Sequence, residues 1–212
     1  RDIAEKYNIT LNALSSAERI FLILRENDRL PEPAPGEARQ IPGRISEITL
    51  DQVSFSYIPG EPVLKDITLN IGGGETIAVV GPTGAGKTSL INLITRFYDP
   101  DDGSIRINGT DIRKFNISDV RAKIALVLQD PFLFSATIRD NIFPDQPDVP
   151  DEEIDPILDT ANCRRFINRL PDGLYTQLSE GGSTLSSGQR QLISIARALA
   201  QDPELIIFDE AT

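Results

Sequence analysis

Apolar residues recur at every third or fourth position through residues 1–29, the pattern of one stripe along an amphipathic helix. The stripe consists of Ile3, Tyr7, Leu11, Leu14, Ala17, Phe21 and Leu24. The proline-rich segment 31–36 is incompatible with a helix and predicts a stiff linker. Such a helix buries its stripe either on the domain that follows or on another part of a larger protein.

From residue 45 onward the apolar pattern changes to short runs that predict strands at 48–57, 63–71, 75–80, 104–107 and 205–208. Helices are expected from residue 88 to about 97 and from the second glycine-rich segment to about 200. Residues 135–180 are expected to be mostly helical and acidic. Strands that alternate with helices predict an α/β fold with a mainly parallel sheet.

The negative net charge of the chain bears on which kinds of partner it can bind. The chain of 212 residues has a formal net charge of −11, from 21 Lys and Arg against 32 Asp and Glu. Nucleic acid and anionic lipid surfaces require concentrated positive charge, so neither is expected as a partner. The acidic run at 145–159 is expected to be a solvated face rather than a site.

Other features of the composition concern the origin of the chain. The single cysteine, Cys163, excludes a disulfide within the chain. The longest apolar runs, at 20–24 and 124–128, have five residues and are too short for a bilayer span. No signal peptide is evident. The sequence begins with Arg1 and has no methionine, so we expect a piece of a longer protein.

The predicted strand at 75–80 leads into a glycine-rich loop and a helix, and this segment fits the pattern G-x-x-x-x-G-K-[ST]. In such a loop, backbone N–H groups and the helix N-terminus bind phosphate. Lys87 is expected to contact the β- and γ-phosphates, and the Thr88 hydroxyl to bind Mg²⁺. The predicted binding residues are Gly81, Pro82, Thr83, Gly84, Ala85, Gly86, Lys87, Thr88 and Ser89.

A pair of carboxylates, Asp209 and Glu210, follows the apolar run 205–208. Ligands of open α/β sheets bind at the carboxyl ends of the strands. Asp209 is therefore expected to hold Mg²⁺, and Glu210 to orient or deprotonate the attacking water.

A second glycine-rich motif, Leu185-Ser-Ser-Gly-Gln-Arg-Gln191, opens a predicted helix. By itself it is a serine-capped helix start and a second potential anion site. Together with the phosphate loop and the acidic pair, it resembles the signature motif of ABC transporter nucleotide-binding domains. Ser187 stands where the common form has glycine. By this resemblance Ser186, Ser187, Gly188 and Gln189 bind the ATP of a partner subunit.

Other segments strengthen the resemblance. Tyr57 matches the aromatic residue that stacks on adenine, although it could be an ordinary strand aromatic. Gln129 matches the glutamine that contacts Mg²⁺ and relays to the membrane domain, and it is a catalytic candidate with Lys87 and Glu210; an exposed loop residue is the alternative. Phe132 and Phe134 are either core residues or contacts to the membrane domain. Residues 180–182 loosely match a cross-linking loop, and 15–21 resemble the segment after the last transmembrane helix of exporters.

The resemblance implies a P-loop NTPase core with a mainly parallel sheet, an antiparallel β subdomain and an inserted helical subdomain at about 135–185. It assigns residues 1–36 to the helix and linker from a transmembrane domain, and 45–212 to an ABC-type ATP-binding domain that is truncated at its C-terminus. The implied ligands are ATP and Mg²⁺.

The function that this implies is ATP hydrolysis that powers export. Two such domains, identical or different, would pair head to tail on the cytoplasmic face of a cell membrane, with a transmembrane domain of the same polypeptide. The sequence has no histidine, whereas the family places one after the acidic pair, so we expect poor turnover from this piece. A regulatory ATP-binding half of a paired exporter and a soluble ABC-type ATPase are the alternatives. The sequence does not indicate the cargo.

Overall fold

The computed structural model describes residues 2–25, 30–34, 36–144, 146 and 148–209. The chain divides into two units, Arg1–Pro31 and Glu32–Thr212. The first unit contains helix α1, Asp2–Arg25, which confirms the helix predicted there. Apolar side chains of α1 such as Leu14 and Phe21 are exposed. None of the helices in the described part of the chain has the length and apolar content that a membrane span requires.

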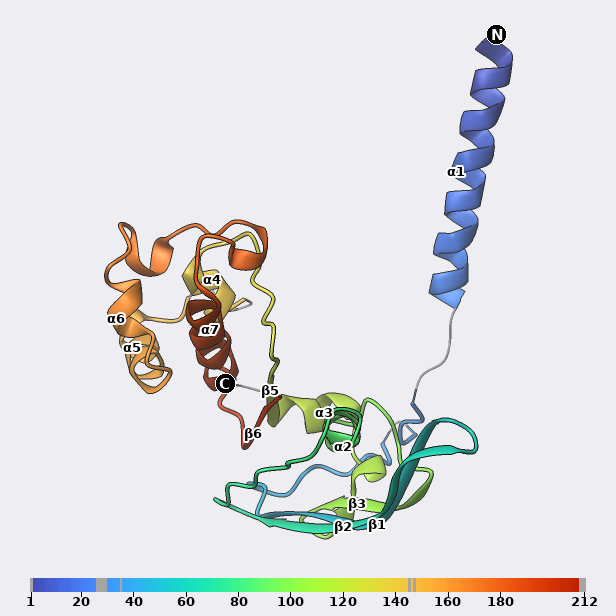
Figure 1. Ribbon diagram of the computed structural model, residues 1–212, viewed down its shortest axis with the longest axis vertical. Coiled ribbons are helices and arrows are strands. Elements are labelled where there is room, and N and C mark those ends of the chain that lie inside the picture. The colour runs from blue at the N-terminus through green and yellow to red at the C-terminus, as the bar shows by residue number, and fades with distance from the viewer. Residues whose placement is uncertain (1, 26–29, 35, 145, 147, 210–212) are drawn as a thin grey trace. The chain divides into compact units, whose positions relative to one another are not determined.

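The second unit contains a four-stranded antiparallel sheet with the strand order β2-β1-β3-β4. Its strands are β1 (Glu47–Ile58), β2 (Glu61–Gly72), β3 (Asp102–Ile107) and β4 (Thr110–Asp111). The strands β1, β2 and β3 are labelled in Figure 1. β1 and β2 form a hairpin around Pro59 and Gly60, and Gly60 has the positive φ, 90°, that glycine adopts readily. The antiparallel β subdomain and three of the predicted strands are therefore confirmed.

An irregularity in β1 explains its imperfect alternation of apolar residues. The pairing of β1 with β2 shifts between Leu50 and Val53, its pairing with β3 shifts between Asp51 and Ser54, and Gln52 has a φ of 50°. This shift is a β-bulge, which inserts a residue and turns the following side chains back toward the core. As a result Leu50, Val53 and Phe55 are all buried, although the interval from Leu50 to Val53 is three residues rather than the two of a regular strand.

The parallel part of the structure is smaller than the sequence predicts. In the described chain the parallel pairing consists of β5 (Ile124–Val127) and β6 (Leu205–Phe208). The expected strand at 75–80 is wrong for this structure: these residues form no strand, and Val80 is 87% exposed. An apolar run becomes a strand only where a neighbouring backbone pairs with its N–H and C=O groups, and residues 75–80 have no such neighbour among the described residues.

The start of β6 is fixed by Glu204. Its carboxylate forms an ion pair with Lys123 beside β5 and accepts a hydrogen bond from the main-chain N–H of Ile45. Burial raises the pKa of the Glu204 carboxyl, but the hydrogen bonds from Lys123 and Ile45 and the nearby positive charges outweigh burial and hold the pKa below its ordinary value. The charged form of Glu204 therefore stabilises the fold.

Replacement of Glu204 with glutamine is expected to lower the free energy of unfolding by about 1 kcal/mol at neutral pH, because the pair is partly exposed. A lowered pKa gives stability that is present above the ordinary value of 4.5 and is lost as the pH falls through the folded-state pKa. Urea unfolding followed by circular dichroism at several pH values measures the difference, with the exposed Glu61→Gln as control. A difference that stays constant below pH 4.5 would contradict the assigned role.

Among the described residues, two large hydrophobic cores and a small one support the second unit, and the small one joins β5 and β6 to α7. The first joins the antiparallel sheet to α2 (Lys87–Ile94), α3 (Ile117–Ala122) and the β5–β6 pair. The second joins α4 (Ile138–Ile142), α5 (Asp151–Thr160), α6 (Arg164–Ile167) and α7 (Ser187–Leu199). Short 3₁₀ helices lie at Ile112–Lys114, Gly173–Tyr175 and Glu180–Gly182. α2 ends three residues before the predicted end, whereas α7 and β6 confirm the prediction; the segment 135–180 is only partly helical.

Cys163 lies in the second core and is fully buried. Burial raises the pKa of its thiol to about 11. The thiol is therefore protonated at neutral pH, and Cys163 acts as a small apolar residue rather than as a nucleophile.

Candidate functional site

The glycine-rich loop is shaped by two glycines with left-handed backbone. Gly84 has a φ of 81°, and Gly86, directly before α2, has a φ of 88°. A Cβ at Gly86 would lie 2.7 Å from Cδ2 of Leu64, so the Leu64 side chain of β2 would have to shift to admit a larger residue there. These constraints give the loop its curled path into the first turn of α2.

Lys87 is bound by its own loop. Its ammonium group donates hydrogen bonds to the carbonyl oxygens of Gly81, at 2.9 Å, and Pro82, at 3.1 Å. Thr88 follows it in the first turn of α2 and is exposed. The loop thus holds a cation over its backbone and offers a hydroxyl beside it, an arrangement that suits a phosphate ligand.

Tyr57 lies near the end of β1, next to α2. Its ring makes edge contacts with Phe55 and Tyr98, with centroids 4.8 and 5.2 Å apart, and it is 46% exposed. Its hydroxyl is within hydrogen-bond distance of Ser89 and Asn92 on α2. The sequence prediction missed Asn92, although its spacing of three from Ser89 places both on one face of the helix.

Gln129 and Asp209 follow the adjacent strands β5 and β6. Val127 pairs with Phe208 at the ends of these strands, and the N–H of Asp209 donates to the Val127 carbonyl at 3.0 Å. Gln129 is exposed and Asp209 is half-buried. The structure thus brings the two residues to the same edge of the parallel pair. Glu210, the predicted catalytic carboxylate, lies outside the described residues.

The segment after Gln129 is attached to α4 and α7. Asn141, which is fully buried, accepts from the N–H of Phe134 and from Arg197, each at 2.8 Å. Arg197 also donates to the carbonyl of Phe132 at 2.9 Å, and burial lowers the pKa of its guanidinium. Phe132 and Phe134 are about half exposed, so the structure excludes the first of the two alternatives for them, a place in the core.

The signature segment begins α7 with a capping box. The Ser186 hydroxyl accepts from the N–H of Gln189 at 3.2 Å, and the Gln189 side chain accepts from the N–H of Ser186 at 2.9 Å. Gln189 is therefore used to cap the helix, and Ser187 and Gly188 are exposed. A Cβ at Gly188 would meet nothing within 4 Å, so packing within the chain does not require this glycine.

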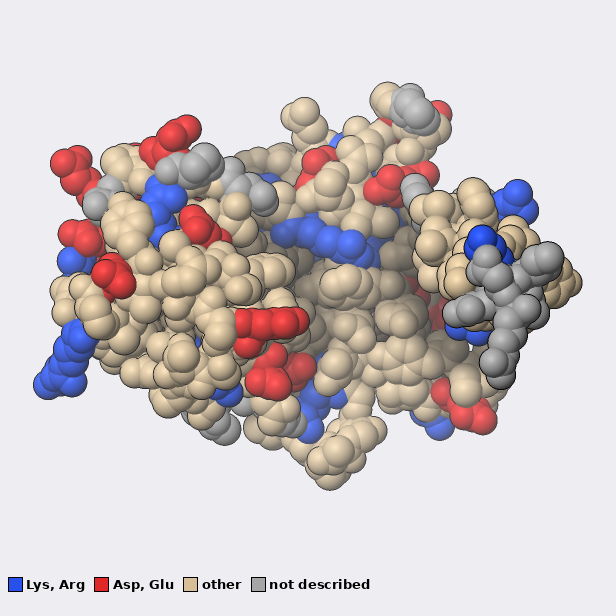
Figure 2. Space-filling view, turned by 90° about the horizontal axis from the view of Figure 1, so that it is seen from above, with Lys and Arg blue, Asp and Glu red and all other residues tan. Residues whose placement is uncertain are grey.

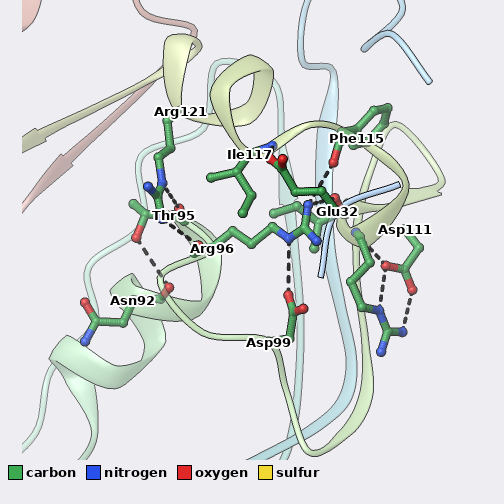
Figure 3. Close-up of polar contacts among 11 residues, drawn as sticks. Glu32, Asn92, Thr95, Arg96, Asp99, Asp111, Phe115, Ile117 and Arg121 are labelled. Carbon is green, nitrogen blue, oxygen red and sulfur yellow. Dashed lines mark hydrogen bonds and ion pairs between the residues drawn. The ribbon is translucent and has the colours of Figure 1, made fainter. Parts of the chain in front are cut away.

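Arg96, just after α2, is a fully buried arginine that the sequence did not single out. Its guanidinium donates to Asp99 at 3.2 Å and to the carbonyls of Ile112, at 3.3 Å, and Phe115, at 2.8 Å (Figure 3). Arg121 of α3 in turn donates to the Arg96 carbonyl at 2.8 Å. These bonds fix the C-terminal end of α2 to the segment that leads into α3.

The described residues contain no group of three or more His, Cys, Asp or Glu side chains that could hold a metal ion. Thr88, Gln129 and Asp209 carry side-chain oxygen atoms at the candidate site. On the face in Figure 2, acidic and basic side chains are interspersed among uncharged residues. Within the described residues, the first core joins α2, which follows the loop at 81–86, to β5 and β6.

Comparisons with known proteins identify the family. Residues 64–212 match the family described as ABC transporter. The chain is 45% identical over its full length to an uncharacterized ABC transporter ATP-binding protein, YfiC, of Bacillus subtilis, of which it covers 35%. It is 42% identical to a fatty acid ABC transporter ATP-binding/permease protein of Mycobacterium tuberculosis, with 99% of the chain and 33% of that protein covered.

A solved structure of a bacterial Atm1-family ABC exporter with ATP bound matches with a TM-score of 0.82 and 34% identity, over 95% of this chain and 35% of that one. The chain thus spans about a third of the length of these relatives. The chain belongs to the ABC transporter family, as an ATP-binding domain homologous to those of exporters.

Proposed function

We propose that this chain binds and hydrolyses ATP to power export through a membrane. The observation that carries the proposal is the glycine-shaped loop at the start of α2, with Lys87 over its backbone. The lysine is held there by two carbonyl oxygens, and a phosphate oxygen is a stronger acceptor because it is charged. The homologous exporter structure contains ATP, as its description states.

Different residues of the site bind the phosphates, the Mg²⁺ ion, the attacking water and the adenine. Lys87 pairs with the β- and γ-phosphates, and the loop residues 81–89 surround the phosphate chain. Thr88, Gln129 and Asp209 are the oxygen ligands for Mg²⁺, a donor set that suits this hard cation together with phosphate oxygens. When bound, Mg²⁺ neutralises charge that develops on the phosphates. Glu210 orients or deprotonates the attacking water, and the exposed ring of Tyr57 stacks on adenine.

The partner is a second ATP-binding domain, identical or different. Glycine inside a helix costs about 1 kcal/mol relative to alanine, and nothing inside the chain requires it at Gly188. The glycine at position 188 is explained if the triphosphate bound on the loop of the partner domain approaches the start of α7 closely. Ser186 and Ser187 also contact this triphosphate. ATP between the two domains closes the dimer, and hydrolysis opens it.

A transmembrane domain is the second partner. Relatives such as the fatty acid transporter are described as ATP-binding/permease proteins, so one polypeptide carries both functions there. We assign residues 1–36 to the connection from such a domain, 45–212 to the ATP-binding domain and about 135–185 to its helical subdomain. The exposed rings of Phe132 and Phe134, held by Asn141 and Arg197, are assigned to the contact with the membrane domain. We therefore assign the chain to the cytoplasmic face of a membrane.

Calorimetric titration of MgATP into the chain tests the proposal. Lys87→Ala is expected to lower the affinity at least tenfold, because it removes a charge that contacts two phosphates. Lys114→Ala, which removes an exposed lysine elsewhere, serves as the charge-matched control, and circular dichroism verifies folding. If a folded wild-type chain binds no MgATP, or if Lys87→Ala binds as tightly as wild type, the proposal is wrong.

A further inference from the structure

Three polar side chains from β1 and α2 form a hydrogen-bonded chain next to the phosphate loop. The amide nitrogen of Asn92 donates to the hydroxyl oxygen of Tyr57 at 3.1 Å. The Tyr57 hydroxyl donates to the hydroxyl oxygen of Ser89, also at 3.1 Å. Asn92 and Ser89 lie one helical turn apart on α2, so the Tyr57 hydroxyl bridges them from the neighbouring strand.

The direction of these bonds determines what Ser89 can do. A hydroxyl has one hydrogen to donate. Asn92 donates to the Tyr57 oxygen, and the Tyr57 hydroxyl in turn donates its hydrogen to Ser89. The Ser89 oxygen is then an acceptor, and its hydrogen remains for another group. Among the described residues, none accepts a hydrogen bond from Ser89, which is only 5% exposed.

The place of Ser89 indicates the acceptor. It follows Lys87 and Thr88 in the first turn of α2, where the helix N-terminus and the loop favour phosphate. Hydrogen-bonded hydroxyls polarise each other, so a Ser89 hydroxyl that already accepts a hydrogen bond is a better donor. The edge contacts of the Tyr57 ring with Phe55 and Tyr98 keep its hydroxyl in place.

We propose that Tyr57 and Asn92 are positioning residues that orient the Ser89 hydroxyl as a hydrogen-bond donor to a nucleotide phosphate. The inference rests on the proposed function, and it gives Tyr57 a second role besides contact with the base. The Tyr57 side chain then connects the two sites, because its ring contacts the base and its hydroxyl acts on the phosphate through Ser89.

Tyr57→Phe separates the two roles, because phenylalanine keeps the ring and loses the hydroxyl. Loss of one oriented hydrogen bond is expected to lower the affinity for MgATP about fivefold. The same loss is expected for magnesium triphosphate, which has no base, because the hydroxyl acts on the phosphates through Ser89. A role in stacking alone predicts that Tyr57→Phe binds triphosphate as tightly as wild type.

The experiment is a calorimetric double-mutant cycle with Tyr57→Phe, Ser89→Ala and the combined variant, titrated with MgATP and with magnesium triphosphate. The expected result is a similar loss in each single variant and no further loss when Tyr57→Phe is added to Ser89→Ala. Tyr98→Phe is the matched control: it removes a hydroxyl from the adjacent ring, which is similarly exposed, and is expected to bind both ligands like wild type. Melting temperatures report any loss of fold separately.

Three results would overturn the inference. One is unchanged triphosphate binding by Tyr57→Phe, and another is full additivity of Tyr57→Phe and Ser89→Ala. Either of these, with tight binding by the wild-type chain, contradicts the inference and leaves the proposed function intact. The third is a folded wild-type chain that binds neither ligand, which contradicts both.

Discussion

Replacement of Arg96 with methionine is expected to destabilise the chain by about 3–5 kcal/mol, the usual cost of removing one partner of a buried ion pair. Methionine fills a similar volume but cannot donate. It leaves the Asp99 carboxylate and the carbonyls of Ile112 and Phe115 without the guanidinium that they bind. The close-up in Figure 3 shows this guanidinium among its acceptors.

Urea unfolding of Arg96→Met, followed by far-ultraviolet circular dichroism, measures this loss. Arg106→Met is the matched control, since Arg106 is 45% exposed and lies 3.6 Å from Asp51 in an ion pair on the surface. It is expected to change the stability by less than about 1 kcal/mol. Equal effects of the two variants would show that the buried network does not hold the end of α2.

Replacement of Gly103 with alanine is expected to destabilise the chain by roughly 3 kcal/mol. Gly103 has a φ of 82°, and a left-handed conformation costs about 1–2 kcal/mol for an alanine. In addition, a Cβ would lie 2.4 Å from the carbonyl oxygens of Asp51 and Gln52. These are backbone atoms of the bulge in β1, so β1 and β3 must separate locally, which adds a cost of similar size.

Gly109→Ala separates the two contributions. Gly109 has a similar φ of 74°, but a Cβ there would meet nothing within 4 Å. The free energy of unfolding of this variant is expected to fall only by the conformational term, about 1–2 kcal/mol. Thermal and urea unfolding of both variants give the comparison, and a Gly103→Ala variant as stable as Gly109→Ala would contradict the close approach at the bulge.

Local patterns were sufficient to predict most elements of this chain. The helix α1, the strands β1 and β2 and the amphipathic helix α7 all follow from periodicity and from cap residues. The loop at 81–88 could be predicted with its helix because glycine, lysine and hydroxyl side chains have well-defined roles at that spacing. Asp209 could be placed at the carboxyl end of a strand because ligands of open α/β sheets bind there, whereas β5, the strand before Gln129, is not predicted from the sequence and Gln129 is assigned only by the family resemblance.

Features that depend on distant parts of the chain could not be predicted. Residues 75–80 have the composition of a buried strand, but pairing requires a neighbour that composition does not reveal. The burial of Arg96 depends on carbonyl groups some 16 and 19 residues further along the chain, which no local pattern encodes. The hydrogen bond between Tyr57 and Ser89 likewise joins positions 32 residues apart.

The exposure of residues 75–80 also affects how the chain behaves in concentrated solution. Ile77, Val79 and Val80 are all exposed, and Glu75 supplies the one charge of this segment. Exposed apolar segments with unpaired peptide groups are templates onto which another chain can add as a strand. These six residues are therefore one place at which the protein is expected to self-associate, and a strand paired with them would prevent it.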